Sequence, residues 1–224
     1  MIGLIGKKVG MTQVFSEKGE VIPVTLIEAG PCTVTEVRTP ERHGYAAVQL
    51  GFGATRAPRI PRPILGQFKK RNLTPNRHLR EFRVEDGHGL EVGQNLTVSI
   101  FEKGHHVDVL GVTKGRGFTG VVKRHGFVAG HASHGPTAGK QPGSIGSSAY
   151  PSRVVKGMRA AGRMGGGRVT IHNLKVLRVD PDNHLLIVEG GIPGAPSGYV
   201  IVRKAVTAKK LKVAQVEKPK KGKK

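Results

Sequence analysis

The stretch Val107–Arg124 reads VDVLGVTKGRGFTGVVKR and joins two different kinds of sequence. Its first part, Val107–Val112, is rich in aliphatic and β-branched residues, which is typical of a strand. From Thr113 onward glycine and basic residues dominate, and apolar residues no longer recur at the period of a helix or a strand. The sequence therefore predicts a strand that ends near Val112 and runs directly into a segment without a core of its own.

This coreless segment continues to about Arg168. Residues 111–168 contain fifteen glycines and few large apolar side chains. Such a segment cannot bury enough apolar area to offset the conformational entropy that it loses on ordering. Long loops without regular structure are usually functional or disordered. We interpret residues 113–168 as an extension that leaves the globular part after Val112 and returns near Val169.

Short strands separated by turns account for most of the remaining chain. Alternation of apolar and polar residues is clear in Ala46–Phe52 and Leu96–Phe101, and Val21–Ala29 is apolar on both faces at its centre. Further strands are predicted at Thr12–Phe15, Thr33–Arg38, Leu174–Val179, Leu185–Val188 and Tyr199–Val202, with a turn at 180–183. Many short strands and few helical patterns predict a mainly β fold, a closed barrel built from residues 1–112 and 169–206.

Charge is distributed unevenly along the chain. The 224 residues include 37 Lys and Arg against 15 Asp and Glu, a formal charge of +22, which resists compaction unless a polyanion neutralises it. No acidic residue lies between Asp108 and Asp180, whereas twelve basic residues do. An ordinary solvated face would mix the two signs. The acid-free segment therefore predicts contact with nucleic acid.

Two further regions are basic. Residues 42–80 lack acidic residues and include a stiff, proline-rich run at 57–63, so we expect a basic insertion at about 54–80. The tail, residues 207–224, contains eight lysines and one glutamate. Its low complexity predicts disorder unless a polyanion orders it.

Several other classes of protein are disfavoured. No stretch reaches 18 apolar residues, and the apolar start at 1–6 lacks the charged region and cleavage site of a signal peptide. Cys32 is the single cysteine, which excludes an internal disulfide and a cysteine-based zinc site. We expect a cytoplasmic protein that does not bind membranes.

Gly115–Gly120 matches the dinucleotide-binding pattern G-x-G-x-x-G and follows a predicted strand. A dinucleotide site also needs a carboxylate about 20 residues further on, and this region has none. We therefore expect no cofactor, and we interpret these glycines as positions where backbone amides approach phosphates, beside Lys114 and Arg116.

His131 and His134 stand three residues apart, but the other ligands that a zinc site needs are missing nearby. Ser133 or Ser144 with His134 lacks the acid that orients the histidine of a catalytic triad. With seven Phe, three Tyr and no Trp, an aromatic platform for single strands is also disfavoured. We expect neither a metal site nor a catalytic site.

Three functions fit a chain with this charge pattern: a structural RNA-binding protein, an RNA-modifying or RNA-processing enzyme with a basic arm, and a DNA-compacting protein. The enzyme needs a cofactor loop, a carboxylate or a cysteine in the acid-free segment, and the DNA-compacting protein favours helices and a dimer. The pattern favours the structural RNA-binding protein.

Four ordered blocks resemble the bacterial large ribosomal subunit protein L3 family. The first block is the opening at 1–12, and the second is the stretch at 108–124. The third comprises 134–135, 142–146 and 156–165, and the fourth comprises 168–170 with the ending at 190–195. The resemblance implies a six-stranded Greek-key barrel whose extension reaches toward the peptidyl-transferase centre. It also implies direct and early binding near the 3′ end of large-subunit (23S-type) ribosomal RNA (rRNA). The expected partners are this rRNA and neighbouring large-subunit proteins in the cytoplasmic ribosome, with no small-molecule substrate. Co-sedimentation with large ribosomal subunits separates this structural function from the enzyme and from the DNA-compacting protein.

The chain departs from the family at 147–151. Members often carry Gln-Asn-Gln and Thr-Pro here, whereas this chain reads Ser147-Ser148-Ala149-Tyr150-Pro151. A glutamine that is methylated in some members falls at Ala149, so that modification is not expected.

The candidate rRNA-binding residues are mostly basic side chains of the acid-free regions, with a few polar residues of the loop tip. They are Lys7, Lys8, Arg56, Arg59, Arg62, Lys69, Lys70, Arg71, Lys114, Arg116, Lys123, Arg124, His131, His134, Lys140, Ser144, Ser148, Arg153, Lys156, Arg159, Arg163 and Arg168.

Overall fold

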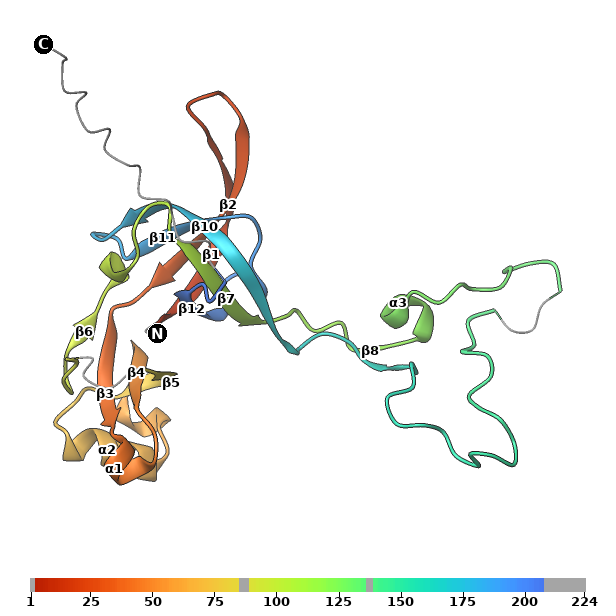
Figure 1. Cartoon of the computed structure of the whole chain (residues 1–224), viewed down its shortest axis with the longest axis horizontal. Helices are drawn as coiled ribbons and strands as arrows, with labels where there is room; N and C mark the ends of the chain where they lie inside the picture. The colour runs from red at the N-terminus through yellow and green to blue at the C-terminus, as the bar shows by residue number, and fades with distance from the viewer. Residues whose placement is uncertain (1–2, 85–88, 136–138, 208–224) are drawn as a thin grey trace, which may run out of the picture.

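The computed structural model describes residues 3–84, 89–135 and 139–207. At its centre six antiparallel strands form a closed barrel in the order β1-β12-β7-β10-β11-β2 (Figure 1). The strands are β1 (Gly3–Phe15), β2 (Val21–Ala29), β7 (His106–Val112), β10 (Arg168–Asp180), β11 (Leu185–Glu189) and β12 (Tyr199–Lys204). The expectation of a mainly β fold with a six-stranded closed barrel is confirmed.

The barrel is closed by the two ends of the described chain. Strand β1 pairs with β12, and Gly3 lies opposite Arg203. Inward-facing aliphatic side chains from all around the barrel, such as Leu4, Ile27, Val109 and Leu186, are completely buried. Removing this apolar surface from water is the main force that holds the barrel together.

A second sheet packs beside the barrel, in the order β5-β4-β3-β6 (Figure 1). Its strands are β3 (Cys32–Arg38), β4 (Ala47–Ala54), β5 (Asn76–Arg83) and β6 (Asn95–Leu96), and it carries α1 (Pro40–His43), the 3₁₀ helix η1 (Ala57–Arg59) and α2 (Arg62–Lys70). The strands expected at 33–38 and 46–52 are therefore present, but they pair with each other rather than with the barrel.

The strand expected at Leu96–Phe101 is wrong beyond its first residue. After Leu96 the chain turns into the 3₁₀ helix η2 (Val98–Ile100), in which the Phe101 N–H donates to the Val98 carbonyl over 2.9 Å. Val98 and Phe101 are both buried although they stand three residues apart. A turn of 3₁₀ helix places residues at that spacing on one face. Burial of Val98 and Phe101 together therefore favours this turn over the strand that the alternation of apolar and polar residues predicted.

Strand β5 and helix α2 were not predicted from the sequence. In β5 only Asn76 and Phe82 are buried, so its pattern is mostly polar. Helix α2 begins with Pro63 in its first turn, where the missing N–H does no harm. One buried side chain, Phe68, anchors α2 to the body. Ile64 and Leu65 are half-buried on the same side as Phe68, so a helical period is present, but it spans only the nine residues of α2.

Between β7 and β10 the chain runs far from the barrel (Figure 1). The regular elements here are short: β8 (Phe118–Thr119), α3 (Val121–His125) and β9 (Gly162–Arg163). Strand β10 is longer than the predicted 174–179: it begins at Arg168, which lies opposite Val112 of β7. The lysine-rich tail expected at 207–224 lies outside the described residues beyond Thr207.

Candidate nucleic-acid interface

The segment between β7 and β10 starts as a two-stranded stem. Backbone hydrogen bonds continue the β7–β10 ladder outward: the Thr113 N–H donates to Gly167, the Arg116 N–H to Met164, and the Met164 N–H to Gly117. Residues 118–119 then pair with 162–163 as β8 and β9. We call residues 113–119 with 162–167 the stem. The stem holds the outgoing and returning chains together although it buries almost no apolar core.

Gly165 allows the two chains of the stem to approach this closely. Its φ is +74°, a conformation that L side chains rarely adopt. A Cβ at this position would also collide with the carbonyl oxygen of Lys114 across the stem. The glycine therefore meets a steric need of the stem itself.

The G-x-G-x-x-G pattern has a different structural role from the one expected. The Arg116 N–H is used in the stem, and Gly120 is the N-cap of α3, a helix of five residues. The Arg116 N–H is therefore not available to a phosphate, whereas the expected approach of other backbone amides of this stretch to phosphates stays a prediction. The guanidinium of Arg116 remains exposed.

Along the whole segment between β7 and β10, almost every candidate side chain faces solvent. Of the fourteen candidate residues between 114 and 168, all but Arg124 are exposed; the others are Lys114, Arg116, Lys123, His131, His134, Lys140, Ser144, Ser148, Arg153, Lys156, Arg159, Arg163 and Arg168. In the described part of the chain, no basic side chain of this segment makes an ion pair with a carboxylate. The segment is an uncompensated row of positive charge.

Arg124 is the exception because it braces the segment internally. Its guanidinium donates to the Ala160 carbonyl over 2.8 Å, and the His125 Nε2 lies 3.1 Å from the same oxygen. These contacts join α3 to the returning chain. Between them, residues 127–135 and 139–159 contain no regular element.

The second sheet presents the other basic surface. Arg56, Arg59, Arg62, Lys69 and Lys70 on η1 and α2 are exposed. Arg71 is half-buried, and its guanidinium already forms an ion pair with the Glu36 carboxylate instead of facing solvent. The structure thus brings five of the six predicted residues of this insertion to one exposed region around α2.

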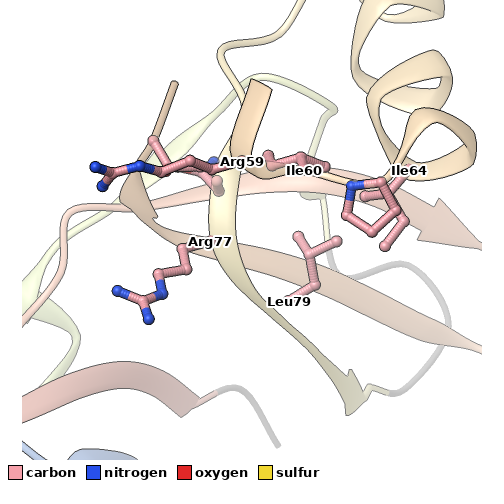
Figure 2. A pocket seen from close by; sticks show the side chains of 8 residues that line it. Arg59, Ile60, Ile64, Arg77 and Leu79 are labelled. Atoms are coloured by element: carbon pink, nitrogen blue, oxygen red, sulfur yellow. The ribbon is translucent and has the colours of Figure 1, made fainter. Parts of the chain in front are cut away.

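A pocket of about 590 Å³ opens between this region and β5. In Figure 2 the guanidinium groups of Arg59 and Arg77 extend away from the apolar wall of Ile60, Ile64 and Leu79. Among the residues that the structure describes, no acidic side chain lines the pocket. The arrangement suits an anion with an apolar neighbour, such as a nucleotide. Arg77 was not among the predicted residues, although it stands in the acid-free stretch that pointed to this surface.

A narrower groove lies where the second sheet meets the barrel. Arg80 of β5 and Arg168 of β10 line it together with Tyr199, whose ring stacks on His78 with 3.6 Å between centroids. Burial lowers the pKa of His78, and Arg77 and Arg80 lower it further, so this histidine is neutral near pH 7. Sequence reasoning missed Arg80, His78 and Tyr199 here, since only folding brings β5 next to β12.

Lys8 was predicted to bind RNA, but its side chain is buried. The ammonium donates to the Ile192 carbonyl over 2.9 Å and to the Gly194 carbonyl over 3.3 Å. Burial lowers its pKa, and the nearby charge of Lys114 adds to this. Lys8 therefore holds the loop before β12 in place. Its neighbour Lys7 is half-buried.

Neither metal nor thiol chemistry has a centre among the described residues. No group of three His, Cys, Asp or Glu side chains there is placed to hold a metal ion. Cys32 is buried, its thiol donates to the Ile5 carbonyl, and burial raises its pKa to about 11. A thiol with that pKa is a poor nucleophile. Among the described helices, none has the length and apolarity required to cross a bilayer.

The fold and its surfaces define a class: small basic β-barrel proteins that carry a long, acid-free segment on a stem. The family model for Ribosomal protein L3 matches residues 82–186. The large ribosomal subunit protein uL3 of Nocardia farcinica is 54% identical over 205 residues, covering 91% of this chain and 93% of the relative. Those of Acidothermus cellulolyticus and Brachyspira pilosicoli are 53% and 48% identical, over 92% and 95% of this chain and 94% and 97% of theirs. The chain belongs to the uL3 family of ribosomal proteins.

Proposed function

We propose that this protein is a structural constituent of the large ribosomal subunit, and that it binds large-subunit rRNA directly. Its relatives of 48–54% identity are proteins of that subunit by name. In this proposal residues 113–168 are an extension that penetrates RNA. The barrel serves as the folded base from which the extension projects.

One observation carries the proposal: a segment free of carboxylates from 109 to 179 exposes every Lys and Arg side chain except Arg124, and among the described residues none of them forms an ion pair with a carboxylate. Left in water, these charges repel one another. RNA phosphates supply the missing negative charge, and the release of their counterions contributes favourably to binding. The glycines of the segment let the backbone follow a crowded RNA surface where side chains would clash.

The second sheet offers a second contact with RNA through Arg56, Arg59, Arg62, Lys69 and Lys70. In the pocket beside them, Arg59 and Arg77 are placed for a phosphate, while Ile60 and Leu79 offer an apolar wall for a base or sugar. Lys8, Arg71 and Arg124 are engaged within the protein. We therefore assign structural roles to these three residues.

The resemblance to the family extends the proposal to assembly. Binding occurs early, near the 3′ end of the 23S-type rRNA, and the extension points toward the peptidyl-transferase centre. The protein then acts by position and catalyses no reaction of its own. Its partners are rRNA and neighbouring large-subunit proteins in the cytoplasmic ribosome.

Salt titration of rRNA binding tests the proposal. If about six to ten phosphates are neutralised, affinity should fall about 10³- to 10⁵-fold between 50 and 200 mM salt, with duplex DNA values as a guide. Arg116→Ala combined with Arg163→Ala should reduce the slope of log affinity against log salt by about 2.

The matched control is Lys18→Ala with Lys103→Ala, which removes the same charge from exposed positions close to acidic residues. Its slope should stay near that of the wild type. A flat salt response of the wild type, or equal losses in both double variants, contradicts direct binding through the extension.

A further inference from the structure

The β1–β2 hairpin extends beyond the barrel to which its strands belong. Strand β12 pairs with β1 only over residues 3–7, and β11 pairs with β2 only over 24–28. Beyond these points β1 and β2 pair only with each other, as far as Phe15 opposite Val21. Figure 1 shows this ribbon projecting from the barrel, well away from the segment between β7 and β10. We call residues 11–23 the hairpin tip.

The turn of the hairpin is well defined. The Ser16 N–H donates to the Glu20 carbonyl over 2.9 Å, and the Ser16 hydroxyl accepts from the N–H groups of Lys18 and Glu20. The backbone of the tip is therefore a defined ribbon closed by a hydrogen-bonded turn. A two-stranded ribbon standing alone in water is only marginally stable, so this one gains from being covered.

The hairpin tip exposes large apolar side chains. Met11 is 55% exposed, Val14 40%, Phe15 64% and Val21 55%. Phe15 and Val21 are opposite partners and form one apolar pair at the outer end. By the register of the two strands, Met11, Phe15 and Val21 lie on one face of the ribbon, and Val14 lies on the other. Exposed apolar side chains gathered on one face are typical of a binding site.

The charge of the hairpin tip is opposite to that of the rest of the molecule. Its turn carries Glu17 and Glu20 against one base, Lys18, in a chain of formal charge +22. Phosphates are repelled by a surface with an excess of carboxylates and gain nothing from exposed Phe and Val. A second copy of this chain is disfavoured because two molecules of such high positive charge repel each other.

We propose that the hairpin tip docks on another protein of the large subunit, at an apolar patch bordered by lysine or arginine side chains. Phe15, Val21 and Met11 enter the apolar patch, and Glu17 and Glu20 pair with the basic border. Such a surface joins an apolar centre to a polar rim, as protein interfaces commonly do. The proposal rests on the proposed function only in that the partner belongs to the same particle.

A photo-crosslinking experiment tests this surface with an internal control. p-Benzoylphenylalanine replaces Phe15 in one variant and Phe118 in another, and fully assembled large subunits carrying each variant are irradiated. Phe118 is 80% exposed in the acid-free segment, beside Arg116. We expect the Phe15 variant to crosslink to one protein of the subunit, at a peptide rich in Lys or Arg, and the Phe118 variant to crosslink to rRNA.

A crosslink from position 15 to rRNA, to a second copy, or to the same chain overturns the proposal, as does the absence of any adduct. Failure of the proposed function looks different, because neither variant would then co-sediment with large subunits, or position 118 would fail to reach rRNA.

Charge reversal provides the second measurement. Glu17→Lys with Glu20→Lys should lower the yield of the protein adduct from position 15 at least several-fold, whereas the yield of the RNA adduct from position 118 stays unchanged. Glu41→Lys with Glu91→Lys, at exposed positions away from the hairpin tip, is the matched control and should leave both yields unchanged. Equal loss in both charge-reversed variants overturns the assigned role of the two glutamates.

Discussion

Asp108 is the last carboxylate before the acid-free segment, and it stabilises the protein rather than facing a ligand. It is completely buried in β7. It accepts a hydrogen bond from the Asn173 N–H over 3.1 Å and lies 3.3 Å from the His172 Nδ1 and 3.5 Å from the Arg203 guanidinium. Asn173 has a φ of +62° within an irregularity of β10 between Ile171 and Leu174. One acid thus fixes the bend in the strand through which the chain returns to the barrel.

The same contacts decide how Asp108 titrates. Burial by itself raises the pKa of this carboxyl, but the Asn173 N–H and the His172 imidazole outweigh it, so the pKa lies below its ordinary value of 3.8. The unfolded chain therefore binds this proton more readily than the folded protein does. The stabilising contribution of Asp108 is complete above pH 3.8 and is lost as the pH falls through the lower folded pKa.

We expect Asp108→Asn to lower the free energy of unfolding by about 1–3 kcal/mol at pH 7, because the Asn173 N–H, His172 and Arg203 lose an ionised hydrogen-bond acceptor. Urea unfolding at several pH values measures this difference. The loss should shrink as the pH falls below 3.8, where the wild-type carboxylate is itself neutralised. Asp182→Asn, at an exposed turn, is the control and should change stability little. A loss that is equal at pH 3 and pH 7 contradicts the assigned role of the charge.

At the scale of elements, the stem is a paired structure with almost no buried apolar side chains. Its strength comes from backbone hydrogen bonds between 113–117 and 164–167, and its side chains remain mostly exposed. Hydrogen bonds of this kind open locally without unfolding the barrel. A steric clash at a single position can therefore open the stem without unfolding the barrel.

Gly165→Ala tests this sensitivity. The substitution forces a side chain into positive φ and against Lys114, a strain of about 1–3 kcal/mol. The amides of Arg116 and Met164 should then exchange their hydrogens about tenfold faster or more, with the melting temperature of the barrel almost unchanged. Gly167→Ala is the matched control, since a Cβ there meets nothing within 4 Å and its φ is not in the positive range. Unchanged exchange in Gly165→Ala means that the stem is not closed as described.

At the scale of the whole molecule, acidic and basic side chains occupy different regions. The carboxylates that form ion pairs, such as Glu36 with Arg71 and Glu81 with Arg38, lie in the body. The segment between β7 and β10 has only basic and neutral side chains. If its outer part, 131–153, lies near the catalytic RNA as we propose, it has no carboxylate for acid–base chemistry and acts by packing against nucleotides.

We expect Ser148→Asp to disturb subunit assembly, or tRNA binding at the peptidyl-transferase centre, because it places a negative charge against phosphates. Peptidyl transfer on purified, fully assembled subunits should slow only partly. His134→Ala, which changes the loop without adding charge, should have the smaller effect. Complete loss of transfer in either variant, with the surrounding RNA unmoved by cryo-electron microscopy, indicates a direct catalytic role and contradicts this account.

The sequence by itself located most of the barrel strands and the composition of the long segment between β7 and β10, but it did not predict the part of β1, Gly3–Lys7, that pairs with β12. Val21–Ala29 and Leu185–Val188 carry local signals strong enough to locate β2 and β11 closely, because both are short runs rich in aliphatic and β-branched residues, which favour strands. The absence of carboxylates from 109 to 179 is likewise a property of the sequence alone. These features need no knowledge of which strand pairs with which.

The tertiary structure alone decided pairing, burial and the neighbours of each side chain. Strands Cys32–Arg38 and Ala47–Ala54 form a second sheet, Lys8 is buried against Ile192, and His78 meets Tyr199 more than a hundred residues away in the chain. Each of these contacts joins residues whose local sequence is equally compatible with exposure or with another partner. The free energy that selects among them comes from burial and hydrogen bonding across the whole fold, which no local pattern contains.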